Sequence, residues 1–283
     1  MEIKQVMVIG AGQMGSGIAQ VCAAGGYDVF LHDLEESLTE QGKQGIKERL
    51  EREVEKERIS DADKERILRR IQPSTDLSNA ENVDIVIEAA VENMEVKKNL
   101  FQQLDNRAPA HAILATNTSS LPITEIAAMT KRAEKVIGMH FMNPVPIMKL
   151  VEIIRGLQTS DETYKAVAEM ASSLKKTSVE VNDFPGFVSN RILMPMINEA
   201  IFTLYEGVSS AEDIDEVMKL GMNHPMGPIT LADFIGLDTC LYIMETLHNE
   251  LGDDKYRPCP LLRKYVKAGW LGKKSGRGFY AYD

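Results

Sequence analysis

The first 180 residues of the chain alternate between short apolar runs and stretches with a helical pattern. The apolar runs are residues 6–9, 29–31, 83–87, 112–115, 136–139, 150–154 and 178–181. Runs of this length are typical of strands that are buried on both faces, and strands that alternate with helices build an open sheet. We therefore predict a mostly parallel α/β sheet for this part of the chain.

The pattern changes after residue 183. Residues 187–205, 211–220, 229–251 and 260–268 all have a helical pattern, with no strand-like run between them. A chain of 283 residues is long enough for two domains of about 100 to 200 residues each. We predict an α/β domain over residues 1–183 and a smaller, all-helical domain over residues 184–283.

Residues 47–70 are a strongly charged segment between the second and third apolar runs. They carry nine basic and eight acidic residues among 24, yet Ile46, Leu50 and Val54 recur every fourth residue. This spacing predicts an amphipathic helix with a narrow apolar stripe. With a second helix start at Ser60, the segment predicts a helical hairpin inserted between the second and third predicted strands.

The second helix of this hairpin has its own start signal. Ser60 followed by Asp63 is the pattern of a capping box, which stabilises the first turn of a helix. Two interpretations of the hairpin remain open. It is a solvated, ion-paired extension, or its basic residues, among them Lys56, reach a phosphorylated ligand.

The net charge and the cysteines exclude several classes of protein. With 32 Lys and Arg against 42 Asp and Glu, long-range electrostatics oppose nucleic acid and anionic membranes as partners. The three cysteines form no C-x-x-C pair, which argues against a disulfide framework and a metal site. No basic leader and no run of 18 apolar residues occurs, so we predict a cytoplasmic protein without membrane segments.

A glycine motif joins the first apolar run to a helical stretch. It reads Gly10, Ala11, Gly12, Gln13, Met14 and Gly15. In this context the first glycine allows a tight turn, the second lets a pyrophosphate approach the helix N-terminus, and the third lets helix and strand pack closely. The motif predicts a Rossmann-type sheet with a dinucleotide site.

Asp33 lies just after the second apolar run, 18 residues after Gly15. A carboxylate at this place accepts hydrogen bonds from ribose hydroxyls and repels a 2′-phosphate, so it predicts NAD as the cofactor without excluding NADP. The alternative is that the glycines serve only a turn and that Asp33 is a surface acid.

Three polar segments follow predicted strands or the domain junction. They are residues 117–120, 140–146 and 183–191. Ligands bind at the carboxyl ends of parallel strands, so all three segments are candidates for one site. Each also has a structural alternative, since serines cap helices, a lone His140 can be a structural hydrogen-bonding group, and Asn190 can satisfy backbone groups.

Six segments together resemble the L-3-hydroxyacyl-CoA dehydrogenases. They read GAGQMGSGIAQ, NTSSLPIT, HFMNPVPIMKLVEII, DFPGFVSNRIL, MKLGMNHPMGPITLADFIGLD and GKKSGRGFYAY. The length is similar to that of the stand-alone bacterial branch that acts on 3-hydroxybutyryl-CoA. The resemblance implies reversible, NAD-dependent oxidation of an (S)-3-hydroxyacyl-CoA to the 3-oxoacyl-CoA. It also implies a homodimer formed through the helical domain.

The resemblance implies catalytic roles for four residues. The family's catalytic histidine falls on His140 and its partner glutamate on Glu152, while Ser119 and Asn190 match the substrate-contacting serine and the asparagine at the domain junction. The chemistry fits, because oxidation of an alcohol needs a base for the hydroxyl proton and imidazole titrates near working pH. Glu152 would orient the ring if the chain doubles back after Pro146.

The resemblance also implies binding contacts. Besides the glycine motif, the cofactor contacts fall on Asp33, Glu92, Lys97, Ser119, Asn143 and Lys274. For the acyl-CoA substrate, Ser119 and the hairpin residue Lys56 match family contacts. A neighbouring CoA contact, which is a small polar residue in the family, is replaced by Arg49 in this chain. Because Asn190 belongs to the second domain, we expect the domains to close over the substrate.

Two alternatives remain open. One is a dehydrogenase of the β-hydroxyacid or 6-phosphogluconate type, which acts without CoA and uses a lysine where this chain has residues 140–144. The other is a non-catalytic NAD-binding or structural protein of the same fold. The joint presence of Ser119, His140, Glu152 and Asn190 argues against it.

Overall fold

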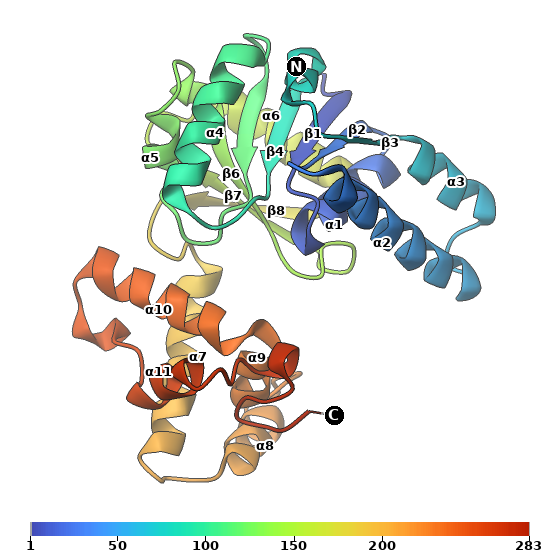
Figure 1. Ribbon diagram of the computed structural model, residues 1–283. Coiled ribbons are helices and arrows are strands. Elements are labelled where there is room, and N and C mark those ends of the chain that lie inside the picture. The colour runs from blue at the N-terminus through green and yellow to red at the C-terminus, as the bar shows by residue number, and fades with distance from the viewer. Residues whose placement is uncertain (1, 283) are drawn as a thin grey trace. The chain divides into compact units, whose positions relative to one another are not determined.

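A computed structural model describes residues 2–282 of the chain (Figure 1). The chain divides into two compact units, Met1–Asp183 and Phe184–Asp283. The eight-stranded sheet lies in the first unit, and the second unit is built from helices. Among the described residues, no helix is both long enough and apolar enough to span a membrane.

One mixed sheet forms the centre of the first unit. Its strands are β1 (Gln5–Ile9), β2 (Asp28–His32), β3 (Ile71–Ser74), β4 (Ile85–Glu88), β5 (Ile113–Thr116), β6 (Val136–Phe141), β7 (Leu150–Arg155) and β8 (Thr177–Asn182). They lie in the order β3-β2-β1-β4-β5-β6-β7-β8. All neighbours are parallel except β6 and β7. The predicted mostly parallel α/β sheet is confirmed.

The helices of this unit pack on the sheet. They are α1 (Gln13–Ala24), α2 (Glu36–Glu55), α3 (Asp61–Arg69), α4 (Met94–Arg107), α5 (Ile123–Ala127), α6 (Asp161–Ser173) and the 3-10 turns η1 (Leu77–Asn82) and η2 (Ala133–Lys135). Val6 and Val8 of β1 join a core cluster with α1 and α6, whereas Met7 between them is fully buried outside that cluster. Successive side chains point to opposite faces, so both faces are covered and the runs are continuously apolar.

The charged segment folds as the predicted hairpin, in which α2 is followed by α3 (Figure 1). Leu50 is buried, and Ser60 and Asp63 form the expected capping box. However, α2 begins at Glu36, earlier than the charge pattern predicts. Its first half lies close to the glycine motif, because a Cβ on Gly42 would come within 2.7 Å of the carbonyl oxygen of Ala11.

Five α-helices make up the described part of the second unit, residues 184–282. They are α7 (Ser189–Tyr205), α8 (Ala211–Gly221), α9 (Pro228–Ile235), α10 (Leu237–Leu251) and α11 (Pro260–Lys267), with the 3-10 turns η3 (Asp254–Tyr256) and η4 (Lys273–Ser275). The prediction of one helix over residues 229–251 is wrong. Gly236 has φ +105°, a conformation that L side chains rarely adopt, and it separates α9 from α10.

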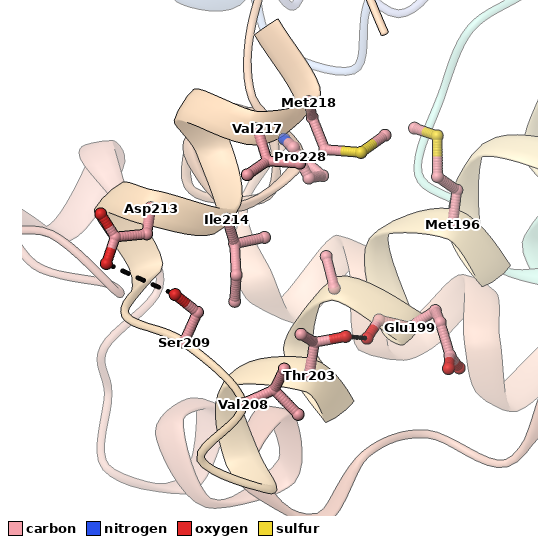
Figure 2. A pocket seen from close by; sticks show the side chains of 11 residues that line it. Met196, Glu199, Thr203, Val208, Ser209, Asp213, Ile214, Val217, Met218 and Pro228 are labelled. Carbon is pink, nitrogen blue, oxygen red and sulfur yellow. Dashed lines mark hydrogen bonds between the residues drawn. The ribbon is translucent and has the colours of Figure 1, made fainter. Parts of the chain in front are cut away.

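An apolar cavity of about 450 Å³ opens between α7 and α8 in the second unit (Figure 2). Its walls include Met196, Val208, Ile214 and Val217, and its few polar side chains are Glu199, Thr203, Ser209 and Asp213. Val208 and Val217 are 70% and 61% exposed. An exposed apolar surface of this kind is typical of a contact with another molecule.

Candidate active site

The glycine motif forms the connection between β1 and α1. Gly10 has φ +98°, and a Cβ there would come within 2.5 Å of the Ala89 carbonyl oxygen, so only glycine fits. A Cβ on Gly15 would lie 1.7 Å from the Gly10 carbonyl oxygen, which explains the close packing of helix and strand. Beside Gly12 a Cβ would meet nothing within 4 Å. The start of α1, which has no side-chain cap, is therefore accessible to a pyrophosphate.

Asp33 follows the last residue of β2 and lies against this motif. Its Oδ2 accepts a hydrogen bond from the backbone N–H of Ala11 at 2.7 Å, and its Oδ1 accepts from Leu34 N–H at 2.8 Å. The carboxylate thus holds the glycine loop as well as providing negative charge at the end of β2. Together with the open backbone at Gly12, this arrangement fits an adenine dinucleotide.

Glu92 connects the loop after β4 to the loop after β5. Its Oε1 accepts from Thr118 Oγ1 at 2.6 Å, Ser119 N–H at 2.9 Å and Ser120 N–H at 3.2 Å. Burial acts to raise the pKa of Glu92, but the charge of Lys97 and these donors outweigh it, so the pKa lies below its ordinary value. An ionised Glu92 therefore fixes the position of Ser119.

Lys97, on α4, is almost completely buried behind this loop. Its Nζ lies 2.6 Å from Glu88 Oε1 and 3.4 Å from Glu92 Oε2. Glu88 ends β4 and also accepts from Thr116 Oγ1 at 2.6 Å. A buried ammonium group persists only when it is paired and hydrogen-bonded. Lys97, a predicted cofactor contact, is thus held by two carboxylates at the carboxyl end of the sheet.

His140 and Glu152 face each other across the antiparallel pair of strands. They are register partners in β6 and β7, and Nδ1 of His140 lies 2.8 Å from Oε2 of Glu152. Both side chains are buried, at 7% and 2% exposed. The chain doubles back after Pro146, as this contact requires. The geometry is that of an imidazole oriented by a carboxylate, suited to proton transfer.

Two asparagines tie the neighbouring loops together. Asn117 Oδ1 accepts from the backbone N–H of Phe141 at 2.9 Å, which links the loop after β5 to the residue next to His140. Asn143 Oδ1 accepts from Gln13 Nε2 at 3.1 Å, which links the loop after β6 to the glycine motif. The loops after β1, β5 and β6 are therefore one connected network.

Sequence reasoning missed Glu88, and it placed Asn117 in a candidate segment without assigning it a contact. Glu88 closes an apolar strand and Asn117 follows the next one, so each occupies the carboxyl end of a parallel strand. A lone acid at the end of a buried run was a usable signal, because such a group needs a partner in the fold. The identity of that partner, Lys97, depends on how α4 packs and is not readable from spacing.

The hairpin carries the two residues expected near CoA. Lys56 is exposed at the C-terminal end of α2. Arg49 is partly buried, with Nε donating to Gln20 Oε1 at 2.8 Å and Nη2 donating to Ser16 Oγ at 3.2 Å. Burial and the neighbouring charge of Arg52 lower the pKa of Arg49. Arg49 thus joins the hairpin to α1.

Two of the predicted site residues belong to the helical unit. Asn190 lies in the first turn of α7 and is 8% exposed. Lys274 lies in η4, and its Nζ donates to Asp238 Oδ2 at 2.7 Å. Among residues 2–282, no group of three or more His, Cys, Asp or Glu side chains is arranged to hold a metal ion.

Comparison with known proteins finds similarity in both units of the chain. The family model for the NAD binding domain of 3-hydroxyacyl-CoA dehydrogenase matches residues 5–184, and that for the C-terminal domain matches residues 186–282. A probable 3-hydroxybutyryl-CoA dehydrogenase of Bacillus subtilis is 64% identical over 100% of this chain and 99% of its own length. Human mitochondrial hydroxyacyl-coenzyme A dehydrogenase is 44% identical over 99% of this chain and 91% of its own.

A solved structure matches equally well. The crystal structure of (S)-3-hydroxybutyryl-CoA dehydrogenase from Ralstonia eutropha superimposes with a TM-score of 0.97 at 51% identity, covering 100% of both chains. The NAD binding domain model and the dehydrogenase relatives define an oxidoreductase that uses NAD as its cofactor. Within that class, the chain belongs to the 3-hydroxyacyl-CoA dehydrogenase family.

Proposed function

We propose that the chain interconverts (S)-3-hydroxybutyryl-CoA and acetoacetyl-CoA, with His140 as the general acid and base. The observation that carries this proposal is the buried contact between His140 and Glu152, at the carboxyl end of the sheet that holds the glycine motif. The names of the bacterial relatives at 64% and 51% identity support the same substrate.

In the oxidation, His140 takes the proton of the 3-hydroxyl group. Its Nδ1 is directed at Glu152, so the proton is exchanged with substrate through Nε2. Glu152 stabilises the imidazolium that forms, and in the reverse direction His140 returns the proton. Bound NAD supplies the hydride acceptor. Ser119, which is fixed by Glu92, is a neutral hydrogen-bond donor for one substrate oxygen. Asn190 is proposed as the donor for a second substrate oxygen.

The cofactor is proposed to contact the glycine motif, Asp33, Glu92, Lys97, Ser119, Asn143 and Lys274. Support comes from the accessible backbone at Gly12 and from Asp33 at the end of β2. Since Asp33 provides negative charge where NADP carries its 2′-phosphate, NAD is the preferred form.

The CoA part of the substrate is proposed to bind along α2. Arg49, Arg52 and Lys56 recur at spacings of three and four residues, which places them on one face of the helix. Lys47 pairs with Glu51 on the same helix. By contrast, Arg49, Arg52 and Lys56 have no carboxylate at ion-pair distance within the described part of the chain. We call these three residues the basic face of α2, and it suits the CoA phosphates.

We also propose that the protein is a homodimer formed through the helical unit. The support is the apolar cavity between α7 and α8, with exposed Val208 and Val217 in its wall (Figure 2). A second copy that covers this surface would bury apolar area that is costly to leave in water.

A cytoplasmic location is also a proposal. Its support is that Cys22, Cys240 and Cys259 are buried and free, which suits a reducing compartment.

One assay tests the proposed function. NADH oxidation is followed with acetoacetyl-CoA, with longer 3-oxoacyl-CoAs and with NADPH in parallel. We expect turnover with acetoacetyl-CoA, and its loss in His140→Gln. Turnover of a 3-hydroxy acid without CoA, and none with any acyl-CoA, would favour the β-hydroxyacid type of enzyme. If NADH binds but no substrate turns over, the non-catalytic alternative holds.

A further inference from the structure

Lys176 directs its ammonium group at backbone oxygens. It lies between α6 and β8, and its Nζ donates to two backbone carbonyl oxygens, those of Val145 and Met148, both at 2.6 Å. Within residues 2–282 it has no carboxylate at ion-pair distance, whereas Lys64 and Lys98, whose side chains are also partly buried, each pair with one. The ammonium group therefore serves one loop, the loop that follows β6.

That loop contains a tight turn over residues 143–148. The backbone N–H groups of Ile147 and Met148 both donate to the carbonyl oxygen of Pro144 at 3.0 Å. The carbonyl oxygens of Val145 and Met148 accept no backbone N–H of the turn. A lysine that caps them stabilises the turn in the way that lysines stabilise the last carbonyls of a helix.

The turn is attached to the cofactor-binding part of the unit on its other side. Val145 is buried, and a Cβ on Gly17 of α1 would come within 2.9 Å of the Val145 side chain. Asn143 at the start of the turn accepts from Gln13 of the glycine motif at 3.1 Å. A shift of the turn would therefore move Asn143 relative to the glycine motif.

We propose that Lys176 is a positioning residue for cofactor binding, which acts by holding the 143–148 turn so that Asn143 stays in contact with the cofactor. The inference rests on the proposed role of Asn143. Lys176 itself donates to backbone oxygens of the turn and acts on the cofactor only through that turn.

The test compares three single variants by their dissociation constants for NADH, measured by fluorescence. Lys176→Met keeps the length of the side chain but removes its charge, and we expect NADH to bind about tenfold more weakly, since two charge-assisted hydrogen bonds are lost. Lys176→Arg keeps a cation and should restore most of the affinity. Lys175→Met is the matched control, because Lys175 is the exposed neighbour of Lys176. This variant should bind NADH as tightly as the wild type does.

A double variant separates positioning from a general loss of stability. In Asn143→Ala with Lys176→Met, the NADH affinity should be no weaker than in Asn143→Ala alone, because both changes remove the same contact. If Lys176→Met lowers the melting temperature but binds NADH normally, Lys176 is only a structural residue and the inference is wrong. Additive losses would also overturn it. The assay needs no thioester, so failure to turn over acetoacetyl-CoA would count against the proposed function alone.

Discussion

At the scale of single residues, the contact between His140 and Glu152 determines how each would act. The carboxylate holds the ring through Nδ1 at 2.8 Å, in a place where both side chains are shielded from water. In such surroundings an ionised carboxylate stabilises a neighbouring imidazolium more strongly than it does in water. The two residues should therefore act as one acid–base unit.

Variants of this pair should lose activity without adding their effects. His140→Gln removes the base, which is typically worth about 10² to 10⁴ in rate, so kcat with acetoacetyl-CoA should fall at least that far while NADH still binds. Glu152→Gln keeps the shape but removes the charge and should also lower kcat severely. The double variant should be about as slow as His140→Gln alone. A rate reduced by the product of both effects would mean that the residues act independently.

Asp33 holds the glycine motif and is also proposed to select the cofactor, and different substitutions separate the two roles. Asp33→Asn keeps an acceptor for the backbone N–H of Ala11 but removes the negative charge, so the ratio of kcat/KM for NADPH to that for NADH should rise about tenfold. Asp33→Ala also removes the acceptor, so KM should rise for both cofactors. Steady-state kinetics with each cofactor measure this. A wild type that already prefers NADPH would contradict the assignment.

At the scale of elements, most strands were predictable because both faces of the sheet are covered and the strands are continuously apolar. β3 was not, since it reads Ile-Gln-Pro-Ser and has no apolar run. It is the edge strand and pairs only with β2. Pro73 has no backbone N–H, and an edge strand tolerates this because no second strand needs that donor. Its place depends on pairing with β2, which sequence pattern does not record.

The candidate site divides in the same way. The glycine motif and Asp33 have fixed spacing within one βαβ unit, so the sequence alone predicts where the cofactor binds. The contact of His140 with Glu152 depends on the register of β6 and β7, and the pairing of Lys97 with Glu88 depends on the packing of α4. Such long-range contacts follow from tertiary structure rather than from any local preference.

The basic face of α2 provides a prediction for an entire helix. Lys56→Glu should raise KM for acetoacetyl-CoA roughly tenfold at an ionic strength of about 0.01 M, and less at higher salt, since exposed charges are screened. KM for a pantetheine thioester, which lacks the nucleotide phosphates, should stay nearly unchanged. Lys47→Glu is the matched control on the same helix, because Lys47 already pairs with Glu51. Equal effects on both thioesters would mean that Lys56 belongs only to a solvated, ion-paired helix.

At the scale of the whole molecule, each unit has a hydrophobic core of its own. One core joins the sheet to α1 and α6, and the other joins α7, α9, α10 and α11. The proposed acid–base pair and most of the proposed cofactor contacts belong to the first unit, whereas Asn190 and Lys274 belong to the second. The net charge of −10 acts over the entire chain, so anionic ligands depend on local groups such as the start of α1 and the basic face of α2.

The proposed homodimer gives the last prediction. Val217→Asp places a charge in the wall of the cavity between α7 and α8, where Val217 is 61% exposed, so the isolated fold should tolerate it. Burying that charge against a second copy would be costly, so the variant should sediment as a monomer of 31.5 kDa and the wild type at about twice that mass. Leu157→Asp is the control, since Leu157 is 86% exposed and lies in the first unit. If both variants sediment like the wild type while circular dichroism shows them folded, the cavity is not the dimer interface.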